Sequence, residues 1–299
     1  MIDLLDYIIE SVATQNPLHG KKLRKNSKKR DDAFKKRAAD FLLKYEILLK
    51  NEGKTIDYSI NCYLQMLADV NFESVQFMQT GEYSSKSFEE VRKRVYNNPE
   101  VMDYYMHGLL LSQFLWPHHY DILLYFNSIL SNNIINIKKY LEVGGGHGLY
   151  ISEAINIIKE DAQYDLVDIS SISLGIAKRM IRYDKVNYVH SDIFEYYPDK
   201  KYDFITMGEV MEHVEDPVKL LRKLYTLVED NGKVFITTPT NAPAIDHIYL
   251  FKNAKDIRSV ILESGFKIED ESCIYSEDLP AEIAEEYKMS MMYTGLLTK

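Results

Sequence analysis

The second half of the chain alternates short apolar runs with amphipathic segments. Apolar residues at helical spacing predict helices over Leu149–Glu160 and Ser170–Tyr183. Strands are predicted for the apolar run that leads into Gly144 and for Gln163–Ile169, Val186–Asp192, Tyr202–Glu209 and Lys233–Pro239. Strands and helices that alternate in this way form a mostly parallel sheet with helices on both faces. The pattern therefore predicts an α/β fold of the doubly wound type.

Residues 1–130 have helical periodicity without this alternation. The predicted helices are Leu4–Thr14, Ala33–Lys50, Ser59–Val70, Phe88–Tyr96 and Val101–Ile129, the last of them interrupted by Pro117. Segments rich in Asn, Pro and Gly separate them, and the first of these breaks is Asn16–Gly20. We therefore predict a helical N-terminal domain over residues 1–130 and an α/β domain over residues 131–299.

The stretch Tyr140–Tyr150 reads YLEVGGGHGLY, a strand that runs into a glycine-rich turn and then a helix. Such a turn lets the backbone approach a ligand and directs free helix N–H groups toward it. Ligands of doubly wound sheets lie beyond the carboxyl ends of the strands, which predicts one crevice for Gly144–Gly148, Asp168, Asp192 and Glu209. Dinucleotide-binding folds, phosphate loops and plain structural turns also use such glycines, so the turn alone does not identify the ligand.

From about Asn136 onward the chain resembles the class I S-adenosylmethionine-dependent methyltransferases, which have a Rossmann-like sheet of seven strands. Their first strand carries E/D-x-G-x-G-x-G, matched here by Glu142, Gly144, Gly146 and Gly148. The resemblance implies S-adenosyl-L-methionine as the cofactor. It also implies a final antiparallel strand pair, here over Phe266–Tyr275 and Lys288–Thr298.

The same resemblance assigns the other cofactor contacts. Asp168 would hold the ribose hydroxyls, Asp192 would contact the adenine amine, and Ile193 would pack on the adenine ring. The neighbouring residues Gly145, Ile169 and Gly208 are assigned to the same site.

A nicotinamide-dependent reductase is the competing interpretation, because it shares the glycine turn and the acid on the second strand. Its fingerprint has two residues between the second and third glycines, whereas Gly144, Gly146 and Gly148 alternate. No Tyr-x-x-x-Lys pair follows the fourth strand either. We therefore favour S-adenosylmethionine.

Composition indicates a folded protein without a membrane partner. The chain has 299 residues, of which 46% are hydrophobic, and this supplies an ample core. No window contains about 18 uninterrupted apolar residues, and the start MIDLLDYIIES has acids where a signal peptide has a basic leader. We expect a cytoplasmic protein in which the isolated Cys62 and Cys273 are reduced thiols.

Charge is uneven along the chain. The net charge is −9, but Lys21–Arg37 holds ten Lys and Arg against two Asp, so the remainder carries −17 by difference. This basic segment either docks an anionic partner or is a solvated helix face or loop. The acidic remainder argues against a nucleic-acid partner. Methyltransferases that act on nucleic acids and protein amides carry an Asn/Asp-Pro-Pro-Tyr motif after the fourth strand. At that place this chain reads MGEVMEH, which resembles small-molecule methyltransferases instead.

The helical N-terminal domain resembles the dimerisation and substrate-lid regions of natural-product O-methyltransferases, which implies a homodimer. Its last segment, Leu109–Tyr125, contains the only Trp of the chain and leads into the first strand of the α/β domain. We predict that Trp116, His118, His119 and Tyr120 contact the substrate. The alternative is an interdomain packing helix with surface histidines.

Methyl transfer from a sulfonium needs alignment and, for a hydroxyl acceptor, removal of a proton. His213 is the first candidate base, because EVMEHVEDP follows the fourth strand and resembles ubiquinone-biosynthesis O-methyltransferases. If Glu209–Val214 is helical, Glu209, Glu212 and His213 share a face. The alternative is that His213 packs against the sheet or caps a neighbour. His247, after the fifth strand, is the second candidate, and Glu209 joins both in the predicted catalytic set.

These residues, with His118 and His119, include enough N and O donors for a divalent metal, but sequence alone does not bring them together and no metal site is assigned. The predicted function is methylation of a small-molecule acceptor, at oxygen, in secondary metabolism or cofactor synthesis. The alternative is a macromolecular acceptor (a peptide, a carrier-bound substrate or nucleic acid) docked through Lys21–Arg37.

Overall fold

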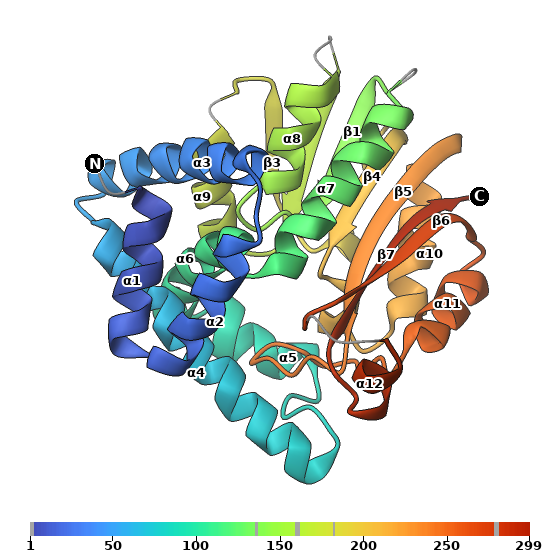
Figure 1. Ribbon diagram of the computed structural model, residues 1–299. Helices are drawn as coiled ribbons and strands as arrows, with labels where there is room; N and C mark the ends of the chain where they lie inside the picture. Colours follow the sequence, from blue (N-terminus) through green and yellow to red (C-terminus); the bar gives the residue numbers. More distant parts are fainter. Residues whose placement is uncertain (1–2, 135–136, 159–161, 182, 278–280) are drawn as a thin grey trace.

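The computed structural model describes residues 3–134, 137–158, 162–181, 183–277 and 281–299. At its centre lies a seven-stranded sheet with the strand order β3-β2-β1-β4-β5-β7-β6 (Figure 1). The strands are β1 (Lys139–Val143), β2 (Gln163–Asp168), β3 (Val186–His190), β4 (Tyr202–Gly208), β5 (Val228–Thr240), β6 (Lys267–Tyr275) and β7 (Met291–Thr298). The predicted α/β fold is confirmed.

Strands β1 to β5 are parallel to one another, and β7 is antiparallel to both β5 and β6. The predicted antiparallel pair at the end of the chain is therefore confirmed. Because β6 is antiparallel to β7, it points in the same direction as β1–β5, and β7 alone is reversed. The carboxyl ends of the five parallel strands meet at one edge of the sheet.

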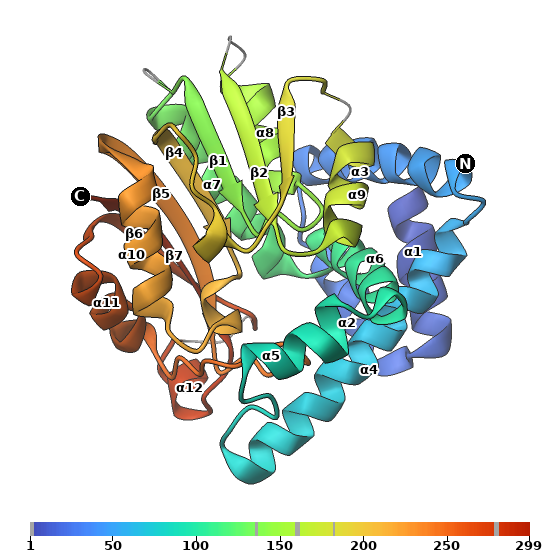
Figure 2. The same cartoon turned by 180° about the vertical axis from the view of Figure 1, so that it is seen from behind.

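Five helices cover the two faces of the sheet. Alternate strand residues face opposite sides, so Tyr140 and Phe204 belong to one apolar cluster while Leu141 and Ile205 belong to the other. The first cluster includes residues of α7 (Pro117–Asn132), α8 (Leu149–Ile158) and α9 (Ser171–Ile181). The second includes residues of α10 (Pro217–Leu227) and α11 (Ala254–Glu263), which lie on the opposite face (Figures 1 and 2). The predicted ends at Glu160 and Tyr183 involve residues 159–161 and 182, which lie outside the described part of the chain.

The N-terminal region is helical, as predicted. Its elements are α1 (Leu4–Gln15), α2 (Pro17–Lys28), α3 (Asp32–Asn51), α4 (Ile56–Thr80), α5 (Phe88–Val91), a π-helical turn η1 (Arg92–Tyr96) and α6 (Pro99–Leu115). The predicted break at Asn16–Gly20 is confirmed at Asn16, which separates α1 from α2, but Pro17–Gly20 are helical, because Asn16 caps α2 through His19 N–H and Pro17 fits its first turn. Extended backbone at Trp116, before Pro117, separates α6 from α7.

The N-terminal helices pack at the carboxyl-end edge of the sheet. Their apolar core includes Ile176 of α9 and Ile245 of the loop after β5, and both α3 and α6 contact α9. Helix α7 instead packs Phe126 and Leu130 against one face of the sheet. The division of the chain at residues 130 and 131 stays a prediction. Within the described residues, no helix combines the length and apolarity that crossing a membrane requires.

Candidate functional site

A cavity of about 1580 Å³ lies between the carboxyl ends of the strands and the N-terminal helices. Its lining joins the glycine turn after β1, the segment after β4, the loop after β5 and the start of α7. Pockets for a single small ligand usually span roughly 300–1,000 Å³. This cavity is therefore large enough for a cofactor and a second substrate together.

The glycine turn has the backbone that its sequence requires. Gly144, Gly146 and Gly148 have φ of 65°, 52° and 75°, a region that favours glycine. A Cβ atom on Gly144 would lie 2.5 Å from Val210 Cγ2, so packing also demands glycine there. At Gly146 the nearest atom to an added Cβ is Met106 Cε, at 3.5 Å, and Gly146 lines the cavity. Gly146 is thus the position where a ligand can approach the backbone.

Two buried carboxyl groups flank this turn. Glu142 at the end of β1 accepts a hydrogen bond of 2.6 Å from Ile151 N–H. Burial raises the pKa of Glu142 to about 8. Asp168 at the end of β2 accepts hydrogen bonds from Ser170 N–H (2.7 Å) and Gly146 N–H (3.0 Å), and burial raises its pKa to about 6.

These groups fit the cofactor that the sequence implies. Cationic groups such as a sulfonium or an ammonium lower the pKa of nearby carboxyl groups and would compensate the burial of Glu142. Each oxygen of Asp168 has a lone pair beyond the one that its backbone donor uses, which suits hydroxyl donors such as those of a ribose. Asp192 and Ile193 begin the short helix η2 (Ile193–Glu195), where Asp192 accepts from Phe194 N–H. Gly145 and Gly208 line the cavity, while Ile169 O lies 2.9 Å from His190 Nε2.

Two imidazoles that line the cavity, His213 and His247, meet a buried carboxyl group that does not line it. Glu212 is fully buried, and its Oε2 accepts from Thr238 Oγ1 at 2.8 Å. Its Oε1 has no hydrogen-bond partner among the described residues and lies 3.6 Å from His213 Nε2 and 4.0 Å from His247 Nε2. The two predicted catalytic histidines therefore lie together, with both Nε2 atoms within 4.0 Å of the same carboxyl oxygen.

Backbone carbonyls fix the tautomers of both rings. His213 Nδ1 lies 3.0 Å from the carbonyl oxygen of Asp246, and His247 Nδ1 lies 2.5 Å from that of Ala242. A carbonyl oxygen only accepts, so each Nδ1 carries the proton and each Nε2 presents a lone pair. Ligand atoms of Glu212, His213 and His247 lie within 4.8 Å of one another, which is a spacing suited to a metal ion.

Glu209 lies beside this group but not on a shared helix. Its φ is 55°, and the helical turn η3 covers only Met211–His213. The condition that Glu209–Val214 is helical is therefore not met, because Glu209 N–H donates to Thr237 O of the neighbouring β5 and holds the residue at the sheet. The Glu209 carboxyl group accepts from Thr237 Oγ1 at 2.6 Å, and burial raises its pKa to about 7.

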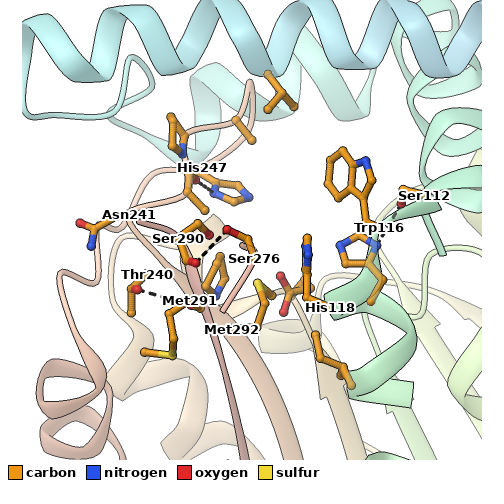
Figure 3. A pocket seen from close by; sticks show the side chains of 18 of the residues that line it. Ser112, Trp116, His118, Thr240, Asn241, His247, Ser276, Ser290, Met291 and Met292 are labelled. Carbon is orange, nitrogen blue, oxygen red and sulfur yellow. Dashed lines mark hydrogen bonds between the residues drawn. The ribbon is translucent and has the colours of Figure 1, made fainter. Parts of the chain in front are cut away.

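The opposite wall of the cavity comes from the start of α7. Figure 3 shows Trp116 and His118 across the cavity from His247 and Met292. Trp116 Nε1 donates to Tyr63 Oη at 2.8 Å, which fixes the indole ring. Trp116, His118 and His119 line the cavity, whereas Tyr120 packs edge-on against Phe34 in the helical core.

Several residues of this site were missed by sequence reasoning. Arg94 and Ser85 both donate to the carbonyl oxygen of Ile245, and Tyr83 Oη accepts from Ala242 N–H. These contacts join the N-terminal region to the loop that carries His247. No local pattern reports them, because the partners are about 150 residues apart. His147 of the glycine turn also lines the cavity and was not singled out.

Curated relatives match part of the chain. Malonyl-[acyl-carrier protein] O-methyltransferase 1 of Ilyobacter polytropus is 31% identical over 104 residues, which are 34% of this chain and 38% of the relative. Ubiquinone biosynthesis O-methyltransferase of Coxiella burnetii is 35% identical over 104 residues, 34% of this chain and 43% of the relative. The corresponding Vibrio vulnificus protein is 28% identical over 130 residues, 42% and 54% of the two chains. The chain thus spans about half the length of these relatives, or less.

Solved structures show the same fold. Mitomycin 7-O-methyltransferase matches with a TM-score of 0.52 and 12% identity, covering 77% of this chain and 68% of that one. N-methyltransferase NodS from Bradyrhizobium japonicum, in complex with S-adenosyl-L-homocysteine, matches with a TM-score of 0.50 and 13% identity, covering 72% of this chain and 100% of that one. At such identities the likeness shows the fold alone. Residues 120–271 match the family model described as "Methyltransferase domain", so this chain belongs to the methyltransferase domain family.

Proposed function

We propose that the protein transfers the methyl group of S-adenosyl-L-methionine to an oxygen of a small-molecule acceptor, in cofactor synthesis or secondary metabolism. The observation that carries this proposal is the cavity itself. Its lining includes both the open backbone of Gly146 and the imidazoles of His213 and His247. A methyl donor at Gly146 and a hydroxyl acceptor at the two imidazoles would share one cavity.

The cofactor supplies an activated methyl group, so the protein mainly binds, orients and excludes water. The turn around Gly146 would take the methionine part, and Asp168 would accept from the ribose hydroxyls. His213 and His247 present unprotonated Nε2 atoms, which can accept the proton of an acceptor hydroxyl. Glu212 would stabilise the imidazolium that results, because its Oε1 is otherwise unpaired.

Binding of a divalent metal ion is a second role that we propose for Glu212, His213 and His247. Burial raises the pKa of Glu212 well above its usual range, and a bound cation would favour the ionised form. Three lone-pair atoms then converge there, because the proton of each ring is on Nδ1. A cation at this point would lower the pKa of a bound hydroxyl. Glu209 would add a carboxylate beside it, whereas His118 and His119 are not part of the cluster.

The N-terminal helices would act as the lid of the acceptor site. Trp116, His118 and His119 supply an aromatic and polar surface facing the proposed base. The same helices expose apolar side chains, among them Leu18, Phe72 and Met78, which supports the proposed homodimer through this region.

A macromolecular acceptor docked through Lys21–Arg37 has less support. Within that segment Lys22, Arg24 and Arg30 pair with Glu277, Glu10 and Asp121. Intramolecular pairing reduces the positive charge that an anionic partner would meet. We therefore favour a small molecule that enters the cavity.

Methyl transfer from labelled S-adenosylmethionine to a panel of small hydroxylated compounds tests the proposal. We expect a labelled ether product and, by calorimetry, binding of both S-adenosylmethionine and S-adenosylhomocysteine. Binding of a nicotinamide dinucleotide in their place would overturn it, and a labelled protein or nucleic acid would favour the macromolecular alternative.

A further inference from the structure

Three histidines form a second imidazole surface in the cavity, apart from His213 and His247. His118 and His119 begin α7, and His147 belongs to the glycine turn. All three rings line the cavity. We call these three residues the imidazole wall. The proposed proton removal uses none of them.

The rings of His118 and His119 are packed together and against the single indole of the chain. The ring centroids of His118 and His119 are 4.6 Å apart, and those of Trp116 and His119 are 5.0 Å apart. His147 lines the same cavity from the glycine turn. The wall therefore combines two packed imidazoles at the start of α7 with a third from another part of the chain.

The hydrogen-bond partners of His119 define which of its nitrogens is free. Ser112 Oγ donates its one proton to Leu109 O at 2.8 Å and lies 3.0 Å from His119 Nδ1. It must then accept from His119, so Nδ1 carries the proton of the ring. His119 Nε2 is left as a hydrogen-bond acceptor with no partner among the described residues.

His118 and His147 have the opposite arrangement. Their Nδ1 atoms are sealed from solvent and have no hydrogen-bond partner in the described part of the chain. A buried N–H without an acceptor is costly, so the proton belongs on Nε2, where the lined cavity can supply a partner. The imidazole wall then offers donors from His118 and His147 and an acceptor from His119.

These rings carry no charge at neutral pH. Burial lowers the pKa of both His118 and His147 to about 4 and holds that of His119 well below its usual range. The rings offer a carboxylate no positive charge, and Lys22, the cation that acts on His118, is already paired with Glu277. An ammonium group could use only the single acceptor. A hydroxyl group both donates and accepts, so it complements the wall without bringing a charge into a buried site.

We propose that the imidazole wall is a binding subsite for an uncharged hydroxyl group of the acceptor, at a position different from the oxygen that is methylated. The ring that carries this hydroxyl packs on Trp116. The subsite rests on the proposed function, because it presumes an acceptor in the same cavity. It narrows the substrate class to cyclic compounds with at least two oxygen substituents.

Ligand binding to the whole protein tests the subsite before the natural acceptor is identified. The probes are 3-methoxyphenol, which has one free hydroxyl beside a methylated oxygen, and 1,3-dimethoxybenzene, which has none. S-adenosylhomocysteine is present so that no methyl is transferred. Ligand-observed NMR measures affinity, and the fluorescence of Trp116, the only Trp, reports binding at the wall. We expect about tenfold tighter binding of 3-methoxyphenol, the effect of one hydrogen bond of ordinary strength.

Variants locate the preference. His119→Phe keeps a planar ring without the acceptor nitrogen and is expected to bind both probes equally, while His213→Phe keeps the preference. A preference lost in His213→Phe but kept in His119→Phe would overturn the proposal, as would tighter binding of 3-methoxybenzoate than of 3-methoxyphenol. Binding of S-adenosylhomocysteine shows that each variant is folded. If the unaltered protein does not bind S-adenosylhomocysteine, the proposed function is wrong. If it binds S-adenosylhomocysteine but does not prefer 3-methoxyphenol to 1,3-dimethoxybenzene, only the subsite is wrong.

Discussion

Gly146 and Asp168 are joined by a hydrogen bond of 3.0 Å from the backbone N–H of the glycine to a carboxylate oxygen. The contact connects the turn after β1 to the end of β2. It means that the carboxyl group proposed to hold the ribose also holds the backbone against which the cofactor would lie. Changes at either residue should therefore alter cofactor binding before they alter the rest of the fold.

Asp168→Asn should weaken binding of S-adenosylhomocysteine about tenfold and remove its pH dependence. Burial raises the pKa of Asp168 to about 6, and the ionised form is the better acceptor for hydroxyl donors. Affinity of the unaltered protein should fall as the pH drops from 7.5 to 5. Calorimetry across this range checks the result, and an unchanged slope in Asp168→Asn would assign the titration to another group.

The contribution of Asp168 to the free energy of unfolding should change with pH in the direction opposite to cofactor affinity. Its pKa is raised in the folded state from an ordinary value of 3.8, so its contribution to folding is largest below that value and is lost as the pH rises through about 6. Tighter cofactor binding above pH 6 would therefore not be a by-product of a more stable protein. Denaturant unfolding at both pH values separates the two effects.

Gly146→Val should abolish cofactor binding. The residue has φ of 52°, which a β-branched side chain rarely adopts, and the added methyl groups would fill the open side of the turn. Gly175→Ala in α9 is the matched control, because its added Cβ meets only the flexible end of Arg179. Calorimetry and thermal unfolding of both variants check this. Normal cofactor affinity in Gly146→Val would refute the assignment of the turn.

The sequence was most informative where function depends on local backbone. The run of glycines from Gly144 to Gly148 and the acid at Asp168 could be read directly, because a positive φ or a strand end leaves a mark on neighbouring residues. The succession of strands and helices along the chain, and hence a mostly parallel sheet, followed from the alternation of apolar runs and amphipathic segments. These features locate the cofactor end of the cavity.

The acceptor end was less predictable, because it is assembled from distant segments. The spacing of Glu209 and His213 suggested one helical turn, but a backbone hydrogen bond to Thr237 of β5 holds Glu209 outside it. His213 and His247 approach each other only because the loop after β5 turns back over η3. Such contacts depend on tertiary packing, which periodicity does not report.

His213→Gln and His247→Gln should each lower turnover about a hundredfold, the usual contribution of proton transfer by a positioned side chain. Cofactor affinity should stay near normal, because neither ring is part of the glycine turn. Initial rates and calorimetry on both variants make the comparison. If only one variant loses turnover, that residue is the base, and near-normal rates in both would mean that alignment alone suffices.

Removal of divalent ions tests the second role of the same side chains. If a metal lies between Glu212, His213 and His247, dialysis against a chelator should lower turnover at least tenfold, and Mg²⁺ or Mn²⁺ should restore it. Glu212→Gln should abolish this restoration, because an amide oxygen binds a divalent ion more weakly than a carboxylate does. If neither the chelator nor the added ions change the turnover rate, the two histidines act without a metal.

Arg94 provides the last prediction, because it acts on the site without facing the substrate. Its guanidinium donates to the carbonyl oxygen of Ile245, two residues before His247. Arg94→Met should loosen this loop and lower turnover about tenfold, since a small misplacement of a catalytic group is costly. The exposed neighbour Arg92→Met is the control and should behave as the unaltered protein. Because the effect works through the position of His247, cofactor affinity should not change. The double variant Arg94→Met, His247→Gln should turn over no more slowly than His247→Gln alone. Fully additive losses of turnover in the double variant would show that Arg94 acts independently of the loop.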